Sequence, residues 1–253
     1  MEQLWFTAFL NRVFGGPVNG LLNALHIHVT DPAHPMTNAF AMEVLVVLIL
    51  ILFFLLIRSS LSVEKPGSLQ HFAESIHEFV DENFAEGVIG HDGHHFLPFL
   101  IALGMFILLS NLIGLIPTLE APTASPVVPL GCALFTFVFY HFHGVKKQGI
   151  GKYIMHFMGP QDPSIPLGIR IFVAILLFPI EIVSHFARIM SLTIRLYGNM
   201  FAGDLVTLAF FSLVPIVFPV VFLGLHIGVS LIQAYIFTLL ASVYLAGAVA
   251  EEH

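Results

Sequence analysis

The sequence predicts an all-α membrane protein with five transmembrane helices, one amphipathic surface helix and a C-terminal pair of long, steeply tilted helices. Three observations lead to this class. The 253 residues are 57% hydrophobic, and only 10% are charged, whereas a soluble domain carries about 25% charged residues. The apolar residues also gather in runs long enough to cross a bilayer. With so few charges, most of the surface must face something other than water.

The composition also excludes several classes of protein. Disordered chains are rich in charge and poor in apolar residues, which is the opposite of what is seen here. A nucleic-acid-binding protein is excluded because the net charge is −7 and no basic tract is present. The single cysteine, Cys132, excludes a disulfide framework and a cysteine-based zinc site.

The first span is expected at residues 38–57, which are rich in Leu, Val and Ile and end before Arg58. This run is too long for a signal-peptide core and no cleavage site precedes it, so we expect it to persist as a span. Residues 64–92 are polar and acidic, but apolar side chains such as Phe72 and Ile76 recur in them at helical spacing. That pattern predicts an amphipathic helix on the membrane surface.

Residues 95–145 are expected to form a helical hairpin, because two apolar runs flank a proline-rich turn at residues 117–126. Residues 167–250 hold two runs that are longer than a span requires. Even 33 residues extend about 50 Å as a helix, against a hydrocarbon core of about 30 Å. These two helices are therefore expected to tilt steeply, to bend at Pro179, or to lie partly along the interface, with a turn at residues 215–219.

Basic residues predict the orientation of the chain. They flank the loop after the first span and cluster after the hairpin, whereas the two proline-containing turns carry none. The residues concerned are Arg58, Lys65, Lys146, Lys147, Lys152 and Arg170. The positive-inside rule then places the N-terminus outside and the C-terminus in the cytoplasm, with Arg12 as a minor contrary indication. An odd number of spans agrees with termini on opposite sides.

The most informative segment is residues 178–205, where polar and charged side chains interrupt an apolar run. A charge at the centre of a membrane helix costs about 2.5–3.5 kcal/mol. At 100° per residue, five of the side chains fall within about 80° of one another. They are Glu181, His185, Arg188, Arg195 and Asn199. These five residues therefore predict one polar stripe on one side of one helix.

Other polar residues in the last two helices lie outside this stripe. Asp204 falls on another face unless the helix bends near Gly198 and Gly203. In the following helix, the i, i+4 and i+7 spacing places three polar side chains on one face. They are His226, Ser230 and Gln233. Two polar faces in lipid are expected to meet each other, a partner or a water-filled cavity.

A purely structural interpretation applies to part of this set. Serines such as Ser184, Ser191 and Ser230 often do no more than hold membrane helices together. Arg188 either snorkels to the interface or pairs with a neighbouring carboxylate or imidazole.

Arg195 is different, because it lies deep in the apolar run and its guanidinium cannot lose its proton. Its own helix face supplies no anion within one turn, so we expect its counter-charge to be a carboxylate of another subunit. Glu181, His185, Asp204 and His226 can instead change protonation state. Titratable groups that could form a path, with a fixed cation that could interrupt it, indicate a proton translocator with an electrostatic gate.

Around these residues the sequence resembles subunit a of the F-type ATP synthase, the stator subunit of the membrane rotor (the FO sector). The matching stretches are SNLIGLIP at residues 110–117, SLTIRLYGNMFAG at 191–203, QAYIFTLL at 233–240 and VYLAGAVAEEH at the end. The second stretch is the most specific of the four. The resemblance covers nearly the whole chain, although the first 35 residues add little to it.

The resemblance implies roles for the residues near the fixed cation. Arg195 corresponds to the arginine that faces the ionisable carboxylate of the rotating c-ring. Asn199 and Gln233 correspond to polar residues that line the path beside it, and Ser191 occupies a position that is usually small.

The resemblance also implies that Glu181, Asp204 and His226 belong to the half-channel open to the outside. Two departures are visible. Asp204 is shorter than the Glu often found there, and Gly114 occupies a position where some bacterial members have an acid. The outer mouth of the path is then expected to rely on Glu120 or on histidines.

Partners and location follow from the same resemblance. It implies a proton-channel stator subunit without catalytic residues, cofactor or metal ion, in contact with the c-ring, b-type stator stalk subunits, other ATP synthase subunits and membrane lipid. The expected location is the plasma (inner) membrane of a bacterium rather than an organellar inner or thylakoid membrane. Both H⁺ and Na⁺ fit the chain, and H⁺ is expected because it is the commoner ion.

Two other functions fit parts of the sequence. An intramembrane metallohydrolase could use the paired and clustered histidines at residues 26–28, 91–95 and 141–143, but no H-E-x-x-H motif is present. A secondary transporter acting alone would show repeated halves and broken helices at matching positions, which this sequence lacks. Stoichiometric zinc in the purified protein would favour the metallohydrolase, and transport by the protein without partners would favour the secondary transporter.

Overall fold

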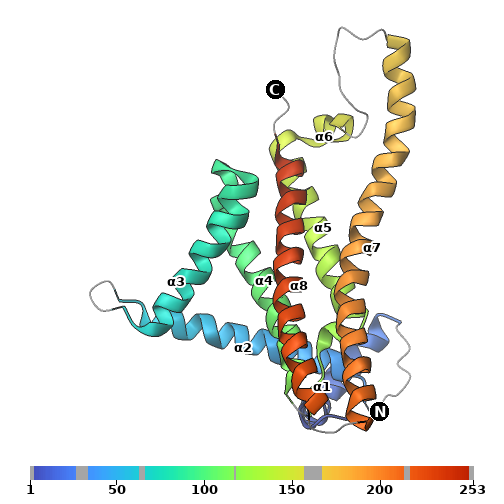
Figure 1. Ribbon diagram of the computed structural model, residues 1–253. Coiled ribbons are helices and arrows are strands. Elements are labelled where there is room, and N and C mark those ends of the chain that lie inside the picture. Colours follow the sequence, from blue (N-terminus) through green and yellow to red (C-terminus); the bar gives the residue numbers. More distant parts are fainter. Residues whose placement is uncertain are drawn as a thin grey trace.

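The computed structural model describes residues 3–26, 34–62, 66–116, 118–156, 167–213 and 217–250 (Figure 1). The α-helices are α1 (Trp5–Ala24), α2 (Asn38–Ser60), α3 (Ser68–Val80), α4 (Leu97–Leu112), α5 (Val127–Gln148), α6 (Ile150–His156), α7 (Leu167–Leu213) and α8 (Val217–Val249). The shorter elements are a π-helix, η1 (Asp81–Ile89), and the 3₁₀ turns η2 (His91–Phe96), η3 (Ile113–Leu115) and η4 (Pro122–Ala124). In the described residues, five helical stretches are long and apolar enough to cross a membrane, and the predicted fold class is confirmed.

The core of the molecule lies where α4, α5, α7 and α8 pack together. Leu100 and Ile107 of α4 are fully buried in it, together with Leu196 of α7 and Phe237 of α8. Because lipid is as apolar as these side chains, close packing rather than the hydrophobic effect holds such a core together.

The helices do not share one direction. In Figure 1, α5, α7 and α8 run alongside one another, whereas α2 runs across them. The 23 residues of α2 extend about 35 Å, close to the thickness of a hydrocarbon core, but the 47 residues of α7 extend about 70 Å. A helix as long as α7 fits a bilayer only when it is steeply inclined, and the crossing of α2 agrees with the predicted tilt.

The breaks predicted in the long pair differ from the structure. Helix α7 continues through Pro179, so the helix is not interrupted at this proline, which the sequence offered as a possible break. A proline removes a single backbone hydrogen bond, which neighbouring turns of a long membrane helix tolerate. Helix α8 begins at Val217, so Pro219 lies in its first turn, where prolines are accepted. Pro215 lies outside the described residues.

The predicted amphipathic segment, residues 64–92, is divided in the structure. It forms α3 and then the wider turns of η1, while residues 64 and 65 lie outside the described part. Helix α3 packs against α4 and beside α2, where the rings of Phe53 and Phe72 lie 6.3 Å apart. The helical periodicity correctly predicted that this segment is helical. It could not predict that η1 has about one more residue per turn than an α-helix.

Helix α1 has no counterpart among the predicted elements. Its residues Phe6 and Leu10 are buried against Met42 of α2. The Asn11 amide donates to the Met36 carbonyl at 3.1 Å and accepts from the Met36 N–H at 3.0 Å. These two hydrogen bonds tie α1 to the segment that leads into α2.

Candidate ion path along α7 and α8

Two adjacent faces of α7 have opposite environments. Leu192, Leu196 and Met200 are buried against the helix bundle. Ser191 and Asn199, which directly precede Leu192 and Met200 in the sequence, are exposed. Helix α7 therefore has a packed apolar face and, next to it, a polar face that the other helices of the described chain leave uncovered.

Arg195 lies on this uncovered polar face, one turn from Ser191 and one turn from Asn199. Its Nη2 donates to Ser191 Oγ at 3.2 Å. Within the part of the chain that the structure describes, Arg195 forms no ion pair with a carboxylate. A hydroxyl neutralises no charge, so the guanidinium keeps its full positive charge at the surface of a membrane helix.

A first titratable group lies on the N-terminal side of Arg195. Glu181 Oε1 is 3.5 Å from His185 Nε2 and 3.6 Å from Arg188 Nη2. The His185 ring is buried, and its Nδ1 lies 2.9 Å from the hydroxyl of Tyr140 on α5. Arg188 also lies over the ring of Tyr244 on α8, 5.0 Å from its centroid. Arg188 is thus held inside the chain by a carboxylate and an aromatic ring.

These side chains surround a cavity of about 100 Å³. It is lined by Tyr140, Tyr153, Glu181, His185, Arg188, Tyr244, Gly247 and Ala248. A cavity with several polar walls and this volume has room for water molecules. Burial raises the pKa of Tyr153 on α6 to about 12, so its hydroxyl remains protonated at neutral pH.

A second titratable group lies on the C-terminal side of Arg195. Asp204 Oδ1 is 4.0 Å from Nδ1 of His226, and the His226 side chain is buried against α7. Gly203 makes room for the imidazole, because a Cβ there would lie 3.3 Å from Nδ1. Helix α7 continues through Gly203, so Asp204 faces α8 rather than joining the stripe, and the bend considered near it is not needed.

The remaining predicted residues of α8 lie on its buried side. Ser230 donates its hydroxyl to the His226 carbonyl at 2.7 Å, one turn back in its own helix. Gln233 is buried two turns from His226. Ser230 therefore bonds within α8, as the structural interpretation of such serines expects.

Along α7, Arg195 separates the two titratable groups. Glu181 lies fourteen positions before Arg195, and Asp204 lies nine positions after it, which corresponds to about 21 Å and about 13 Å of helix. Helix α7 runs from the end of the molecule that carries α6 and the C-terminus to the end that carries the N-terminus (Figure 1). The two groups therefore lie toward opposite ends of the molecule.

Comparison with known proteins identifies the family. A family model described as ATP synthase A chain matches residues 40–246. The ATP synthase subunit a of Koribacter versatilis (strain Ellin345) is 58% identical over 252 residues, which cover 100% of this chain and 99% of that protein. The subunit of the same name from Solibacter usitatus (strain Ellin6076) is 46% identical, over 95% of this chain and 100% of that protein. That from Campylobacter fetus subsp. fetus (strain 82-40) is 39% identical over 87% of this chain and 94% of that protein.

The chain belongs to the ATP synthase subunit a family. The resemblance drawn from the sequence motifs is thereby confirmed, and the chain is a multi-pass membrane subunit of the FO sector. The family model covers α2 to α8 nearly completely and leaves out α1, the helix that the sequence did not predict.

One departure from the pattern of subunit a now has a physical reason. A Cβ at Gly114 would lie 2.9 Å from the backbone nitrogen of Ala121, so any larger residue displaces the segment that leads to η4. That segment is fixed to α4 by Thr123, whose hydroxyl donates to Asn111 Oδ1 at 2.6 Å. Glu120 lies beside it and is exposed, and its Oε1 accepts from the Asn38 amide at 3.4 Å.

Sequence reasoning missed two residues of the site, Tyr140 and Tyr244. Tyr140 lies on α5, for which no polar stripe was predicted, and Tyr244 lies on α8 beyond the polar residues predicted there. Only packing brings the two tyrosines to α7. The His141 ring of α5 also lies near the site, 4.7 Å from His185 between ring centroids. His94 instead pairs with Asp81 at 2.9 Å. In the described residues, no three His, Cys, Asp or Glu side chains form a group that could hold a metal ion.

Proposed function

We propose that this chain is the proton-channel stator subunit of a rotary ATP synthase and provides two half-channels that load and unload protons on the c-ring carboxylates. The observation that carries the proposal is the position of Arg195. Its charge lies on an uncovered face of a membrane helix, bonded only to a hydroxyl in the described chain, between two separate titratable groups.

The gate follows from electrostatics. A c-ring carboxylate crosses lipid only when protonated, because its ionised form would be buried without a counter-charge. Opposite Arg195 the ionised form is favoured, so a proton leaves there and another is taken up on the far side. The guanidinium cannot lose its proton, so it carries none between the half-channels. Each proton that crosses the membrane potential releases about 2.3 kcal/mol per 100 mV, which biases the rotation.

The two titratable groups serve the two half-channels. Asp204 and His226 form the half-channel open to the outside, as the resemblance implies. Glu181 lies with His185 beyond Arg195, so we assign these two to the opposite half-channel, together with the polar cavity beside them. This differs from the role that the resemblance implies for Glu181. Asn199 and Gln233 line the passage beside the arginine.

Orientation and partners complete the proposal. The basic residues Lys146 and Lys147 end α5 at the end of the molecule that carries α6 and the C-terminus. The positive-inside rule makes that end cytoplasmic and the N-terminal end external, in a bacterial plasma membrane. The c-ring covers the face of Arg195, b-type stalk subunits hold the chain as a stator, and nucleotide chemistry belongs to other subunits.

The experiment that tests this proposal is ATP-driven proton uptake by vesicles containing the whole complex. Arg195→Ala is expected to abolish uptake while the amount of chain assembled into the complex stays unchanged. Ile194→Ala is the matched control, because Ile194 is the adjacent residue and is exposed, with 57% of its surface accessible. Uptake that persists in Arg195→Ala would show that the charge is not the gate.

A further inference from the structure

The imidazole of His185 has a different kind of hydrogen-bond partner from that of the histidine beside it. Nδ1 of His185 lies 2.9 Å from the hydroxyl oxygen of Tyr140, which is buried. Nδ1 of His141 instead lies 3.0 Å from the backbone carbonyl of Phe137. A carbonyl only accepts, so it requires a hydrogen on the nitrogen that faces it, whereas a hydroxyl both donates and accepts.

The Tyr140 hydroxyl is therefore suited to both charge states of His185. A neutral ring with its hydrogen on Nε2 needs a donor at Nδ1, and a protonated ring needs an acceptor there. A hydroxyl meets both needs by turning its hydrogen, while both rings stay in place. His185 can then gain and lose a proton without leaving its buried Nδ1 unbonded, a loss that burial makes costly.

Charged groups on the other side of the ring determine which nitrogen carries the hydrogen of the neutral form. Glu181 Oε1 lies 3.5 Å from His185 Nε2 and 3.6 Å from Arg188 Nη2. An ionised Glu181 accepts hydrogen bonds but donates none, so Nε2 must carry the hydrogen that faces it. Arg188 also lies close to the Tyr140 hydroxyl, where its charge attracts the oxygen. The hydroxyl hydrogen is then left to point at Nδ1.

Packing holds the His185 ring in this position. The rings of Tyr140 and His185 are stacked, with centroids 6.0 Å apart, and the His141 ring meets His185 edge-on at 4.7 Å. Tyr153 of α6 and Tyr244 of α8 complete the titratable groups around the polar cavity, which both Tyr140 and His185 line. Water in this cavity can exchange a proton with His185.

We propose that Tyr140 is a positioning residue of the cytoplasmic half-channel, which keeps His185 hydrogen-bonded in both charge states and so lets it exchange protons with the cavity. When the ring is protonated, it gains one hydrogen, the water of the cavity loses one, and the Tyr140 hydroxyl keeps its own, turned away from Nδ1. This inference rests on the proposed place of His185 in that half-channel.

The test is ATP-driven proton uptake by inverted vesicles that contain the whole complex, measured at different pH values on the cytoplasmic side. Tyr140→Phe removes the hydroxyl and keeps the ring. Protonated His185 then lacks its acceptor, so uptake is expected to fall about fivefold at alkaline pH, the effect of one hydrogen bond, and to approach the original rate at acidic pH. No loss, or a loss by the same factor at every pH, would overturn the proposal.

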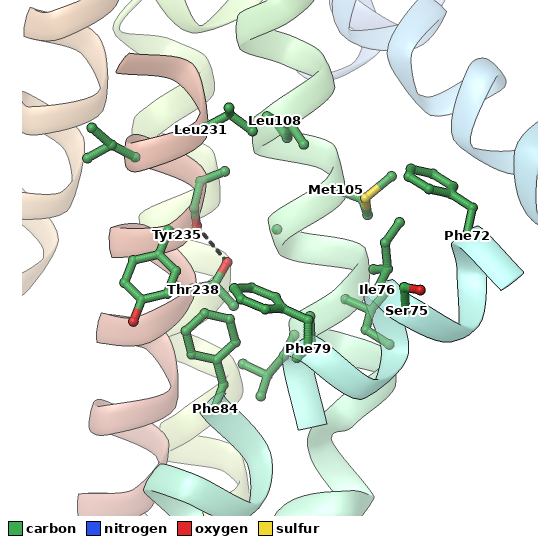
Figure 2. A pocket seen from close by; sticks show the side chains of 16 residues that line it. Phe72, Ser75, Ile76, Phe79, Phe84, Met105, Leu108, Leu231, Tyr235 and Thr238 are labelled. Atoms are coloured by element: carbon green, nitrogen blue, oxygen red, sulfur yellow. Dashed lines mark hydrogen bonds between the residues drawn. The ribbon is translucent and has the colours of Figure 1, made fainter. Parts of the chain in front are cut away.

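Tyr235→Phe is the matched control. Tyr235 of α8 lies beside Phe79 and Phe84 in the lining of an apolar pocket that contains no residue of the ion path (Figure 2). Its substitution removes the same hydroxyl and is expected to leave uptake unchanged at every pH. An equal pH-dependent loss in both variants would overturn the proposal.

A double substitution separates this inference from the proposed function. His185→Gln alone is expected to slow uptake, because an amide does not titrate, and adding Tyr140→Phe is expected to cause no further pH-dependent loss. A further loss of the same size would show that Tyr140 acts independently of His185, and would overturn this inference alone. Unchanged uptake in His185→Gln would contradict the place of His185 in the half-channel, and the role of Tyr140 with it.

A second variant keeps the proposal testable if Tyr140→Phe does not assemble. 3-Fluorotyrosine in place of Tyr140 keeps the ring and the hydroxyl, but its more acidic hydroxyl accepts more weakly from a protonated imidazole. A smaller loss of uptake with the same pH dependence is expected. An assembled complex with the original pH dependence would overturn the proposal.

Discussion

Arg188 and Arg195 lie two turns apart on the same helix, and the structure treats them differently. Arg188 is 3.6 Å from Glu181 and lies over the ring of Tyr244. Arg195 donates to Ser191 and has no carboxylate partner in the described residues. Identical side chains thus form one internal contact network and one uncovered charge.

The difference shows which arginine needs another subunit. A charge within a membrane helix costs about 2.5–3.5 kcal/mol unless something offsets it. Arg188 is offset by an ion pair and by a cation–π contact, which is worth about 0.5–2 kcal/mol. Among the residues that the structure describes, Arg195 has neither kind of contact. We therefore infer that its offset comes from another subunit, as the proposed gate facing a moving carboxylate requires.

Substituting each arginine in turn is the strongest test of the difference between Arg188 and Arg195. Arg188→Ala is expected to keep ATP-driven proton uptake, lowered at most severalfold, where Arg195→Ala loses it completely. Its main effect is structural, a loss of about 1 kcal/mol in stability from the cation–π contact. Thermal inactivation of the complex measures this loss. Equal loss of uptake in both variants would show that the two arginines share one role.

The next largest effect is expected at the outer titratable group. Asp204→Asn or His226→Ala removes one proton carrier and should slow proton uptake by up to about a hundredfold, the lower end of what a positioned acid or base contributes. Neither change should make the membrane leak, because Arg195 remains. A stopped-flow measurement of vesicle pH gives both the rate of uptake and the leak. A leak would show that Asp204 and His226 have a structural role rather than a role in proton transfer. Ser230→Ala on the same face is the control, since that hydroxyl bonds only within α8.

A smaller effect is expected at the inner group. Glu181→Gln should slow uptake by roughly tenfold, which corresponds to about 1.4 kcal/mol in the barrier, because water in the polar cavity and His185 still offer a route. The same measurement of vesicle pH, made while protons flow in the opposite direction, shows which side of the membrane the defect in Glu181→Gln affects. Slower release on the cytoplasmic side supports the assignment of Glu181, whereas slower uptake from the outside would return Glu181 to the outer half-channel.

The sequence predicted the spans and most of the site because both depend on local composition. The start of α2 at Asn38 and both ends of α7 agree with the apolar runs. Arg195 could be singled out because no apolar stretch accepts a permanent charge without a reason.

Features that arise from packing between distant segments could not be predicted. Tyr140 reaches His185 only because α5 lies against α7, and no periodicity in α5 indicates it. Helix α1 depends on Asn11 bonding the backbone of Met36, a contact that hydropathy does not reveal. The neighbours of the predicted stripe also change along α7: Glu181 lines a cavity with residues of α5, α6 and α8, whereas Asn199 is exposed.

The most direct test of the central claim is the passive proton permeability of vesicles that contain the complex with its catalytic sector attached and no nucleotide, so that the rotor is held still. The fixed charge of Arg195 is proposed to stop protons from passing directly between the two half-channels. Vesicles with the original chain and with Ile194→Ala are expected to hold an imposed pH gradient, whereas vesicles with Arg195→Ala dissipate it. A gradient held equally well by Arg195→Ala would contradict the account.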